Sequence, residues 1–450
     1  MADLPADGAI AYLQTFNNWE TKLQSADAAS FGLDRVERVL DVFGRPDSDL
    51  RFAHVAGTKG KGSVCAFLAS ILRASGYRTG LYTSPHLHSM TERIRVLEPG
   101  APASGFEGAV TLQEIADRLS YYRHDLDALR AAGAGITFYE IMTVLAMSFF
   151  ATRQARIVVL ETGLGGRLDA TNAVETAVCG ITPVGLDHTN ILGGTPALIA
   201  AEKAGIIRSP SQRVTLAPQA PEVMAVLRER CRSFGIHPTL VGTDLPCVVH
   251  EVTARGVWFT AEGRRRYDGL FSPLAGAHQA ENATLAIGMA EDLETYGYMI
   301  TAESVREGIR SVHWPARFEH LGEAQAVILD CAHTFESAAA LEQTFRRAYP
   351  GRKAVVVLGM SADKDVRAFG KALAPVTGSL VLTKADNPRA RHISVDDMQE
   401  GLPGVECEAV PGVARALARA REIAGKDGLV LVTGSVFVCA QAREVLRVPV

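Results

Sequence analysis

The stretch HVAGTKGKGSVCAFLASILRASG, residues 54–76, decides the fold of this chain. It overlaps a short apolar run at 52–55 that is typical of a buried strand. Further along, apolar side chains recur at the spacing of one helix face, at Val64, Phe67, Leu68, Ile71 and Leu72. Gly76 stands where such a helix would end on a left-handed residue. The stretch therefore predicts a strand, a tight loop and an amphipathic helix in succession.

The loop between this strand and helix is GTKGKGS, made of Gly57, Thr58, Lys59, Gly60, Lys61, Gly62 and Ser63. Glycines let backbone N–H groups turn inward, a helix N-terminus adds positive potential, and a lysine ammonium reaches phosphate oxygens. The spacing differs from the standard P-loop, because Gly62 separates Lys61 from Ser63. A glycine-rich turn with two solvated lysines is the alternative interpretation. The flanking strand and helix favour a loop that binds nucleotide phosphates.

Composition narrows the class of protein. The chain has 450 residues, 47% of them hydrophobic and 21% charged, which is typical of a globular enzyme with two or three domains. A formal net charge of −4 offers no general attraction for nucleic acid or an anionic membrane. The seven cysteines form no CxxC pair, and the N-terminus shows no signal-peptide pattern. We therefore expect a cytoplasmic protein with no nucleic-acid or membrane partner.

Apolar runs alternate with helical stretches along the chain, which predicts a mostly parallel sheet covered on both faces. Helices are expected near 19–24, 33–44, 111–131 and 136–150. Strands are expected within 77–87, 156–161, 176–185, 326–330, 353–359, 379–385 and 428–435. Short alternating runs at 240–271 predict a small antiparallel section.

We expect two domains, because the α/β pattern restarts after Ser311–Ala316, where Pro315 interrupts any helix. Residues 1–310 form a P-loop α/β domain that includes the antiparallel section. Residues 311–450 form a smaller Rossmann-like α/β domain.

Polar residues follow several of the predicted strands, at the edge where parallel sheets bind ligands. Glu161 ends a strand and is a natural Mg²⁺ ligand beside a phosphate loop, with Ser84 adding a hydroxyl oxygen. An ion pair between Glu161 and Arg167 is the alternative. His188 is a candidate ligand for a second ion, although a lone histidine is more often structural. Asp169 is expected to order its own loop.

Three further residues are harder to interpret from the sequence alone. Asp330 ends a strand of the second domain, where it would hold ribose hydroxyls or cap a helix, and the two interpretations stay open. Arg317, at the predicted joint between domains, is placed to reach a nucleotide phosphate. Lys203 reads as an ordinary exposed helix lysine.

Several motifs together resemble those of folylpolyglutamate synthase/dihydrofolate synthase, the folate branch of the Mur ligase superfamily. In chain order they are GTKGKGS, LYTSPHL with ERI, ETGLGGRLDATN, ITPVGLDHTNILG, IAAEKAGII, LAGAHQAENA, WPARFE, DCAH and GSVFV. They run from about residue 50 to 440. Two departures are Cys331, where the family often has glycine, and Ala316 in WPARFE.

The resemblance implies an ATP-dependent ligase that adds L-glutamate to a folate, tetrahydrofolate or dihydropteroate, through an acyl phosphate. It implies that Gly57 to Ser63 hold the phosphates, with Lys61 catalytic. It implies two Mg²⁺ ions, held by Ser84, Glu161 and His188, with His188 also among the catalytic residues. Lys203 matches a catalytic lysine that the family carbamylates. Asn282, Arg317, Asp330 and His333 match nucleotide-binding positions, and a monomer is expected.

Two other functions compete with this expectation. One is a related Mur-type amino-acid ligase acting on a nucleotide-linked peptidoglycan precursor, and the TSPHL and GLGGRLDATN motifs favour the folate branch over it. The other is a nucleotide-binding regulator without catalysis, which would lack metal ligands, whereas Ser84, Glu161 and His188 are all present.

Overall fold

The computed structural model describes residues 4–20, 31–100, 105–322, 325–399, 402 and 404–448. Contacts between Cα atoms group the chain into two compact units. The first comprises Met1–Cys247, Ala261–Asp268 and Glu281–Val312, and the second comprises Val248–Thr260, Gly269–Ala280 and His313–Val450.

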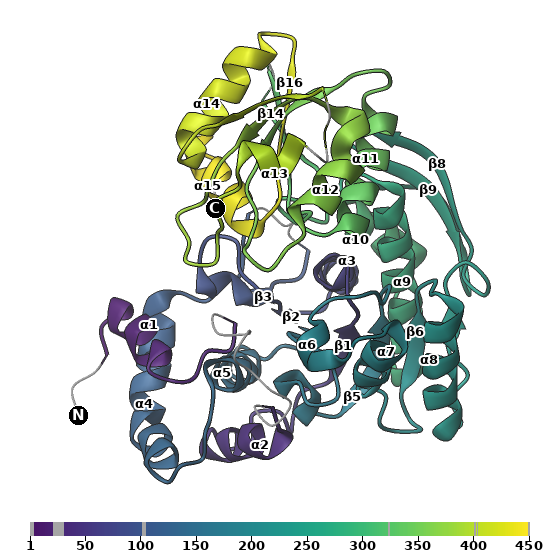
Figure 1. The fold of residues 1–450 in the computed structure, drawn as a ribbon. Coiled ribbons are helices and arrows are strands. Elements are labelled where there is room, and N and C mark those ends of the chain that lie inside the picture. Colours follow the sequence, from purple (N-terminus) through teal and green to yellow (C-terminus); the bar gives the residue numbers. More distant parts are fainter. Residues whose placement is uncertain are drawn as a thin grey trace. The chain divides into compact units, whose positions relative to one another are not determined.

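Within the described residues, the first unit is built on a seven-stranded sheet in the order β3-β2-β4-β1-β5-β6-β7 (Figure 1). Its strands are β1 (Phe52–Ala56), β2 (Thr79–Tyr82), β3 (Ile94–Leu97), β4 (Ile157–Glu161), β5 (Thr176–Ile181), β6 (Arg213–Leu216) and β7 (Thr239–Leu240). Only the β2–β3 pair is antiparallel among these neighbours. The predicted mostly parallel sheet is confirmed.

Helices cover both faces of this sheet. They are α1 (Ala6–Gln14), α2 (Leu33–Val42), α3 (Lys61–Ala74), α4 (Leu112–Ala131), α5 (Phe138–Thr152), α6 (Thr189–Leu192), α7 (Pro196–Ala204), α8 (Pro221–Ser233), α9 (Ala277–Leu293) and α10 (Ala302–Arg310), with 3-10 turns η3 (Met90–Arg93), η4 (Ala170–Ala173) and η5 (Glu294–Tyr296). Tyr82 and Leu160 point toward α1, α2, α4 and α5, and Cys179 points toward α7 and α8. Gly180, the next residue, points to the other face against Met289 of α9.

Some of the helices expected from the sequence are present in the structure, and one is not found among its described residues. The helix expected near 33–44 is α2, and α3 is followed by Gly76 with φ of 87°. The helix expected near 19–24 is a turn at 19–20, and residues 21–24 lie outside the described ranges. Across the described part of the chain, no helix has both the length and the apolar composition needed to cross a membrane.

A three-stranded sheet in the order β10-β9-β8 lies within the segment expected to be antiparallel. Its strands are β8 (Cys247–Thr253), β9 (Gly256–Glu262) and β10 (Arg266–Ser272). The connections between them are too short for a parallel crossover, so the strands are antiparallel. Residues of this sheet belong to both of the compact units defined above.

The second unit contains, in its described part, a six-stranded sheet in the order β11-β12-β16-β13-β14-β15; strands β14 and β16 are labelled in Figure 1. Its elements are β11 (Glu319–Leu321), β12 (Ala326–Asp330), α11 (Phe335–Ala348), β13 (Ala354–Leu358), α12 (Val366–Leu373), η6 (Ala374–Val376), β14 (Thr377–Leu382), α13 (Val395–Gln399), β15 (Glu406–Ala409), α14 (Val413–Ala424), β16 (Leu429–Thr433) and α15 (Val436–Val445). Only β11 is antiparallel to its neighbour. Helices α11 and α12 share a core with one face, as Phe345 and Phe369 show. This second α/β sheet confirms the predicted fold class.

Candidate functional site

The loop between β1 and α3 requires glycine at two positions. Gly57 has φ of 145° and Gly60 has φ of 90°, and both values are rare for residues with a Cβ. A Cβ on Gly57 would lie 1.8 Å from Thr182 Oγ1, and a Cβ on Gly60 would lie 2.6 Å from Asn282 Oδ1. The loop backbone is therefore in close contact with the end of β5 and with α9.

The first half of this loop is tied to β5. The amides of Thr58 and Lys59 both donate to the carbonyl oxygen of Pro183, at 3.0 and 3.4 Å. The helix α3 begins directly after Gly60, and no side chain caps it. The amides at the helix start, from Lys61 to Ser63, therefore have no intrahelical acceptor and suit an anion.

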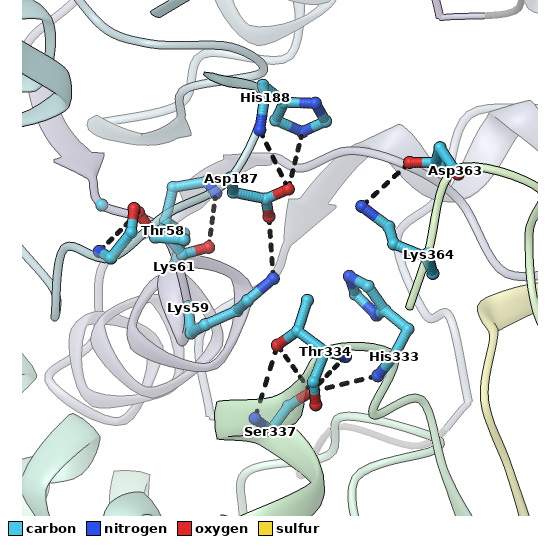
Figure 2. Close-up of polar contacts among 12 residues, drawn as sticks. Thr58, Lys59, Lys61, Asp187, His188, His333, Thr334, Ser337, Asp363 and Lys364 are labelled. Atoms are coloured by element: carbon cyan, nitrogen blue, oxygen red, sulfur yellow. Dashed lines mark hydrogen bonds and ion pairs between the residues drawn. The ribbon is translucent and has the colours of Figure 1, made fainter. Parts of the chain in front are cut away.

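The two loop lysines have different surroundings. Lys59 Nζ lies 2.8 Å from Asp187 Oδ2, and the Asp187 carboxylate in turn accepts the backbone amide of His188 at 3.2 Å (Figure 2). Lys61 Nζ lies 3.5 Å from the carbonyl oxygen of Thr58, within its own loop. Lys61 is therefore the lysine that stays close to the helix start. The pairing of Asp187 with Lys59 was not predicted from the sequence.

Lys203 is buried, with 4% of its surface exposed, so the prediction of an exposed helix lysine was wrong. Its Nζ donates to the carbonyl oxygen of Gly57 at 2.7 Å. Burial, together with the charge of Lys61, lowers the pKa of Lys203 to about 7. A large share of this amine is therefore neutral near pH 7. The periodicity of α7 could not reveal this burial, because the element that covers Lys203 is distant in sequence.

The GLGGRLDATN segment fixes the end of the helix that carries Lys203. The amide of Arg167 donates to the carbonyl oxygen of Glu202 at 2.8 Å, and Asn172 Nδ2 donates to that of Gly205 at 3.1 Å. A Cβ on Gly166 would lie 2.8 Å from the carbonyl oxygen of Glu202. The glycine and the asparagine therefore serve a close backbone approach, a role that the sequence analysis missed.

Asp169 orders the same segment. Its carboxylate accepts the amide of Leu164 at 2.8 Å and the hydroxyl of Thr171 at 2.5 Å. Thr171 also contacts His54 Nε2 at 2.8 Å, and His54 is fully buried in β1. Because the Thr171 hydroxyl donates to Asp169, His54 donates from Nε2. The network connects the strand before the phosphate loop to the segment after β4.

Glu161 and Ser84 come together at the carboxyl ends of β4 and β2. The backbone amide of Ser84 donates to Glu161 Oε2 at 3.1 Å, and Glu161 is 6% exposed. Arg167, the alternative partner of Glu161, is paired with Glu202 at 2.9 Å. His188 is the N-cap residue that precedes α6, with φ of 51°, and its Nε2 lies 3.8 Å from Asp187 Oδ1.

The donor set suits Mg²⁺ as a partly protein-bound ion. No cluster of three or more His, Cys, Asp and Glu side chains that could hold a metal occurs in the described ranges. Mg²⁺ is usually bound through one or two carboxylates, with waters and substrate phosphates completing its shell. The buried Glu161 carboxylate, which lies opposite Val55 of β1 just before the glycine-rich loop, matches that requirement, whereas Ser84 contacts it through the backbone amide.

In the second unit, Asp330 organises the segment around Arg317. Its carboxylate oxygens accept the amides of Phe318 at 2.9 Å and Ala332 at 2.8 Å, and burial raises its pKa. Ala316 and Phe318 have positive φ values of 55° and 50°, so both residues flanking Arg317 are left-handed. Asp330 therefore holds a strained loop.

The interpretation of Asp330 as a helix cap was wrong, because Thr334 caps α11. The Thr334 side chain accepts the amide of Ser337, and the Ser337 hydroxyl accepts the amides of Thr334 and His333 (Figure 2). His333 Nδ1 lies 2.9 Å from the carbonyl oxygen of Cys331.

An ion pair between Arg443 and Glu319 stabilises the loop that carries Arg317. Arg443 of α15, whose side chain is 1% exposed, is hydrogen-bonded to Glu319, and Glu319 Oε2 accepts the amide of Ala316 at 2.9 Å. The sequence analysis missed this pair. The acidic end of the WPARFE motif was its only signal.

Comparisons with known proteins show the family of this chain. Residues 316–436 match the family described as Mur ligase, glutamate ligase domain. The chain is 33% identical over 424 residues to dihydrofolate synthase/folylpolyglutamate synthase of Bacillus subtilis, covering 92% of this chain and 95% of that one. It is 34% identical over 417 residues, 92% of its length, to a probable bifunctional folylpolyglutamate synthase/dihydropteroate synthase of Haloferax volcanii, but spans only 48% of that protein.

A solved structure extends the agreement to the fold. Mycobacterium tuberculosis folylpolyglutamate synthase complexed with ADP superposes with a TM-score of 0.86 at 28% identity, covering 99% of this chain and 100% of that chain. The chain therefore belongs to the dihydrofolate synthase/folylpolyglutamate synthase family of Mur ligases.

Proposed function

We propose that this protein is an ATP-dependent ligase that joins L-glutamate to the terminal carboxylate of a folate. The folate carboxylate attacks the γ-phosphorus of ATP, which gives an acyl phosphate and ADP. The amine of glutamate then attacks the acyl carbon, and the amide forms as phosphate leaves. The observation that carries the proposal is the uncapped start of α3, with Lys61 close by and the Ser84–Glu161 pair at the same sheet edge.

The first unit supplies the groups that act on phosphate. The amides from Gly60 to Ser63 and the ammonium of Lys61 bind the phosphates of ATP, while Gly57, Thr58 and Lys59 shape the loop. Phosphoryl transfer needs positioning and charge neutralisation, which this arrangement provides. Ser84 and Glu161 would hold one Mg²⁺, and Glu161 with His188 a second. Bound Mg²⁺ neutralises charge that develops on the transferred phosphoryl group.

Lys203 is proposed to be carbamylated. A neutral lysine amine attacks carbon dioxide, forms an N–C bond and loses one proton, which leaves an anionic carbamate. The lowered pKa of Lys203 supplies the neutral amine near pH 7. A carbamate oxygen is a hard ligand, so the modified side chain would add an oxygen donor for Mg²⁺.

Further residues are assigned to the nucleotide. Asn282, which lies against Gly60, is proposed to contact it from α9. Arg317 is assigned to a phosphate, and Asp330 and His333 to the nucleoside. Residues 1–310 would act as the ATP-binding domain and 311–450 as the ligase domain, a division that the family match over 316–436 supports. We further assign the protein to the cytoplasm as a monomer.

The test is an assay of ADP release by the purified protein with ATP, Mg²⁺ and L-glutamate. Dihydropteroate and tetrahydrofolate are compared as acceptors, with a UDP-linked peptidoglycan precursor as the control. We expect release that needs both glutamate and a folate acceptor, with the glutamylated product seen by mass spectrometry. Turnover with the UDP-linked acceptor alone, or ATP hydrolysis that ignores both substrates, would refute the proposal.

A further inference from the structure

Two buried thiols lie in the second unit and have no part in the chemistry proposed above. Cys331 follows Asp330 directly and is 5% exposed, and Cys439 lies in α15 and is fully buried. The two side chains are close enough for each thiol to shift the pKa of the other. Cys439 Sγ also lies 3.7 Å from the carbonyl oxygen of Val432. Each thiol is therefore held toward the other rather than toward solvent.

The backbone on both sides keeps these thiols together. Strands β12 and β16 pair in parallel, with Asp330 opposite Thr433. The amide of Gly434 then donates to the carbonyl oxygen of Ala332 at 3.0 Å, before α15 begins at Val436. The chain after β16 thus crosses the end of β12, which brings α15 against Cys331. The juxtaposition belongs to the sheet and does not depend on a surface loop.

The surroundings of Cys331 favour its reactive form. The neighbouring Cys439 thiol, followed by the charge and hydrogen bond of Arg317, lowers the pKa of the Cys331 thiol and outweighs burial and the charge of Asp330, which raise it. Burial raises the pKa of the five cysteines outside this pair, which are Cys65, Cys179, Cys231, Cys247 and Cys407. Because the thiolate is the nucleophile in cysteine oxidation, Cys331 is the cysteine most suited to react.

We propose that Cys331 and Cys439 form a reversible disulfide when the protein meets hydrogen peroxide. The Cys331 thiolate attacks one peroxide oxygen, the O–O bond breaks, hydroxide leaves, and Cys331 becomes a sulfenic acid. The Cys439 sulfur then attacks the Cys331 sulfur, the S–O bond breaks, and water leaves with the Cys439 proton. Two thiols are oxidised and one peroxide is reduced to water. Hydrogen peroxide is a small oxidant, which suits a buried pair of thiols better than a bulky disulfide would.

The consequence for ATP rests on the proposed function. Disulfide formation shortens the sulfur–sulfur separation to about 2.05 Å and therefore moves Cys331. The amide of Cys331 donates to the carbonyl oxygen of Ala316 at 3.1 Å, so this movement reaches the loop that carries Arg317. We expect the KM for ATP to rise about tenfold, the scale of one lost hydrogen bond to a charged group.

The test treats the full-length protein with hydrogen peroxide and maps its peptides without reduction. The expected product is a linked peptide containing Cys331 and Cys439, two hydrogens lighter than the free pair, which dithiothreitol releases. The KM for ATP should rise with the linked fraction and return on reduction. Cys439→Ala should give no linked peptide and keep its KM for ATP under peroxide. Cys407→Ala, altered at a cysteine of β15, is the matched control and should behave as the wild type.

Separate alkylation of Cys331 and Cys439 after peroxide treatment, with no linked peptide, would overturn the inference. Equal peroxide sensitivity of the wild type and Cys439→Ala would overturn its link to ATP. The peptide map needs only the wild-type protein, so it remains decisive if Cys439→Ala does not fold. It also needs no activity, so a failed ligase assay with a positive map would refute only the proposed function.

Discussion

Lys203 Nζ lies 2.7 Å from the carbonyl oxygen of Gly57, so a buried lysine of α7 is bonded to the first residue of the phosphate loop. The two residues are distant in sequence and meet because β1 and β5 are neighbours in the parallel sheet. A buried amine whose pKa is lowered to about 7 thus lies against the glycine-rich loop.

Removing bicarbonate should reduce activity, because the carbamate that we propose at Lys203 forms from a neutral amine and carbon dioxide. We expect activity to fall in carbon-dioxide-free buffer and to return when bicarbonate is added. A carbamate signal should appear by NMR with ¹³C-labelled bicarbonate. Lys203→Met should show neither the signal nor the response. Full activity of Lys203→Met would refute the role.

The same residue predicts how stability depends on pH. Burial lowers the pKa of Lys203 to about 7 from 10.5, so between these values the unfolded chain binds more protons than the folded one. The free energy of unfolding should therefore gain a contribution that rises with pH over this window. Urea unfolding in carbon-dioxide-free buffer at pH 7 and pH 9 measures it. Lys203→Met should lack this contribution, and an identical pH dependence in both proteins would contradict the assignment.

Lys61→Ala should lower the rate of ADP release by about 100-fold or more, because the charge that faces the phosphates is lost. The melting temperature should change little, since a loop lysine adds little to the core. Lys59→Ala is the matched control: its ion pair with Asp187 is partly exposed, and we expect a smaller loss of activity. Largely unchanged activity of Lys61→Ala at saturating ATP would argue against the phosphate site.

Glu161→Gln should raise the Mg²⁺ concentration needed for half-maximal activity, because an amide is a weaker ligand for a hard cation than a carboxylate. A Mg²⁺ titration of ADP release measures the effect. Glu202→Gln is the control, because it removes the partner of Arg167 but keeps Glu161. It should leave the Mg²⁺ concentration for half-maximal activity unchanged. Identical titrations of wild type and Glu161→Gln would exclude Glu161 as a ligand.

Gly57→Ala should destabilise the protein more than Gly76→Ala does. Both positions have positive φ, but a Cβ at Gly76 meets nothing within 4 Å, whereas at Gly57 it would lie 1.8 Å from Thr182 Oγ1. Gly76→Ala should cost about 1–2 kcal/mol of backbone strain alone. Chemical denaturation of both variants compares them, and equal losses would mean that the loop is not held against β5.

Arg443→Met should lower the free energy of unfolding by about 3 kcal/mol, because it leaves Glu319, whose side chain is only 15% exposed, without its cation. It should also raise the KM for ATP, since Glu319 holds the amide of Ala316 beside Arg317. Changing both Arg443 and Glu319 to Met should recover part of the stability. Arg310→Met, which breaks an exposed pair with Glu307, is the control and should cost less than about 1 kcal/mol. If Arg443→Met and Arg310→Met lowered the free energy of unfolding equally, the ion pair of Arg443 would contribute no more than an exposed one.

Much of the architecture followed from local sequence patterns. The glycine-rich loop, the strand before it and the helix after it lie within residues 52–76, so their spacing alone predicted them. Short edge strands such as β11 and β15 were not predicted, because three or four residues carry too little periodicity.

The sequence by itself determined the alternation of strands and helices, the glycine loop and the family, because periodicity and motif spacing are local properties of the chain. Only the tertiary structure decided that Lys203 is buried, that Thr334 rather than Asp330 caps α11, and that Arg443 pairs with Glu319. The physical reason is that burial and pairing depend on which distant segments the sheet order brings together. That order is set by the packing of whole elements.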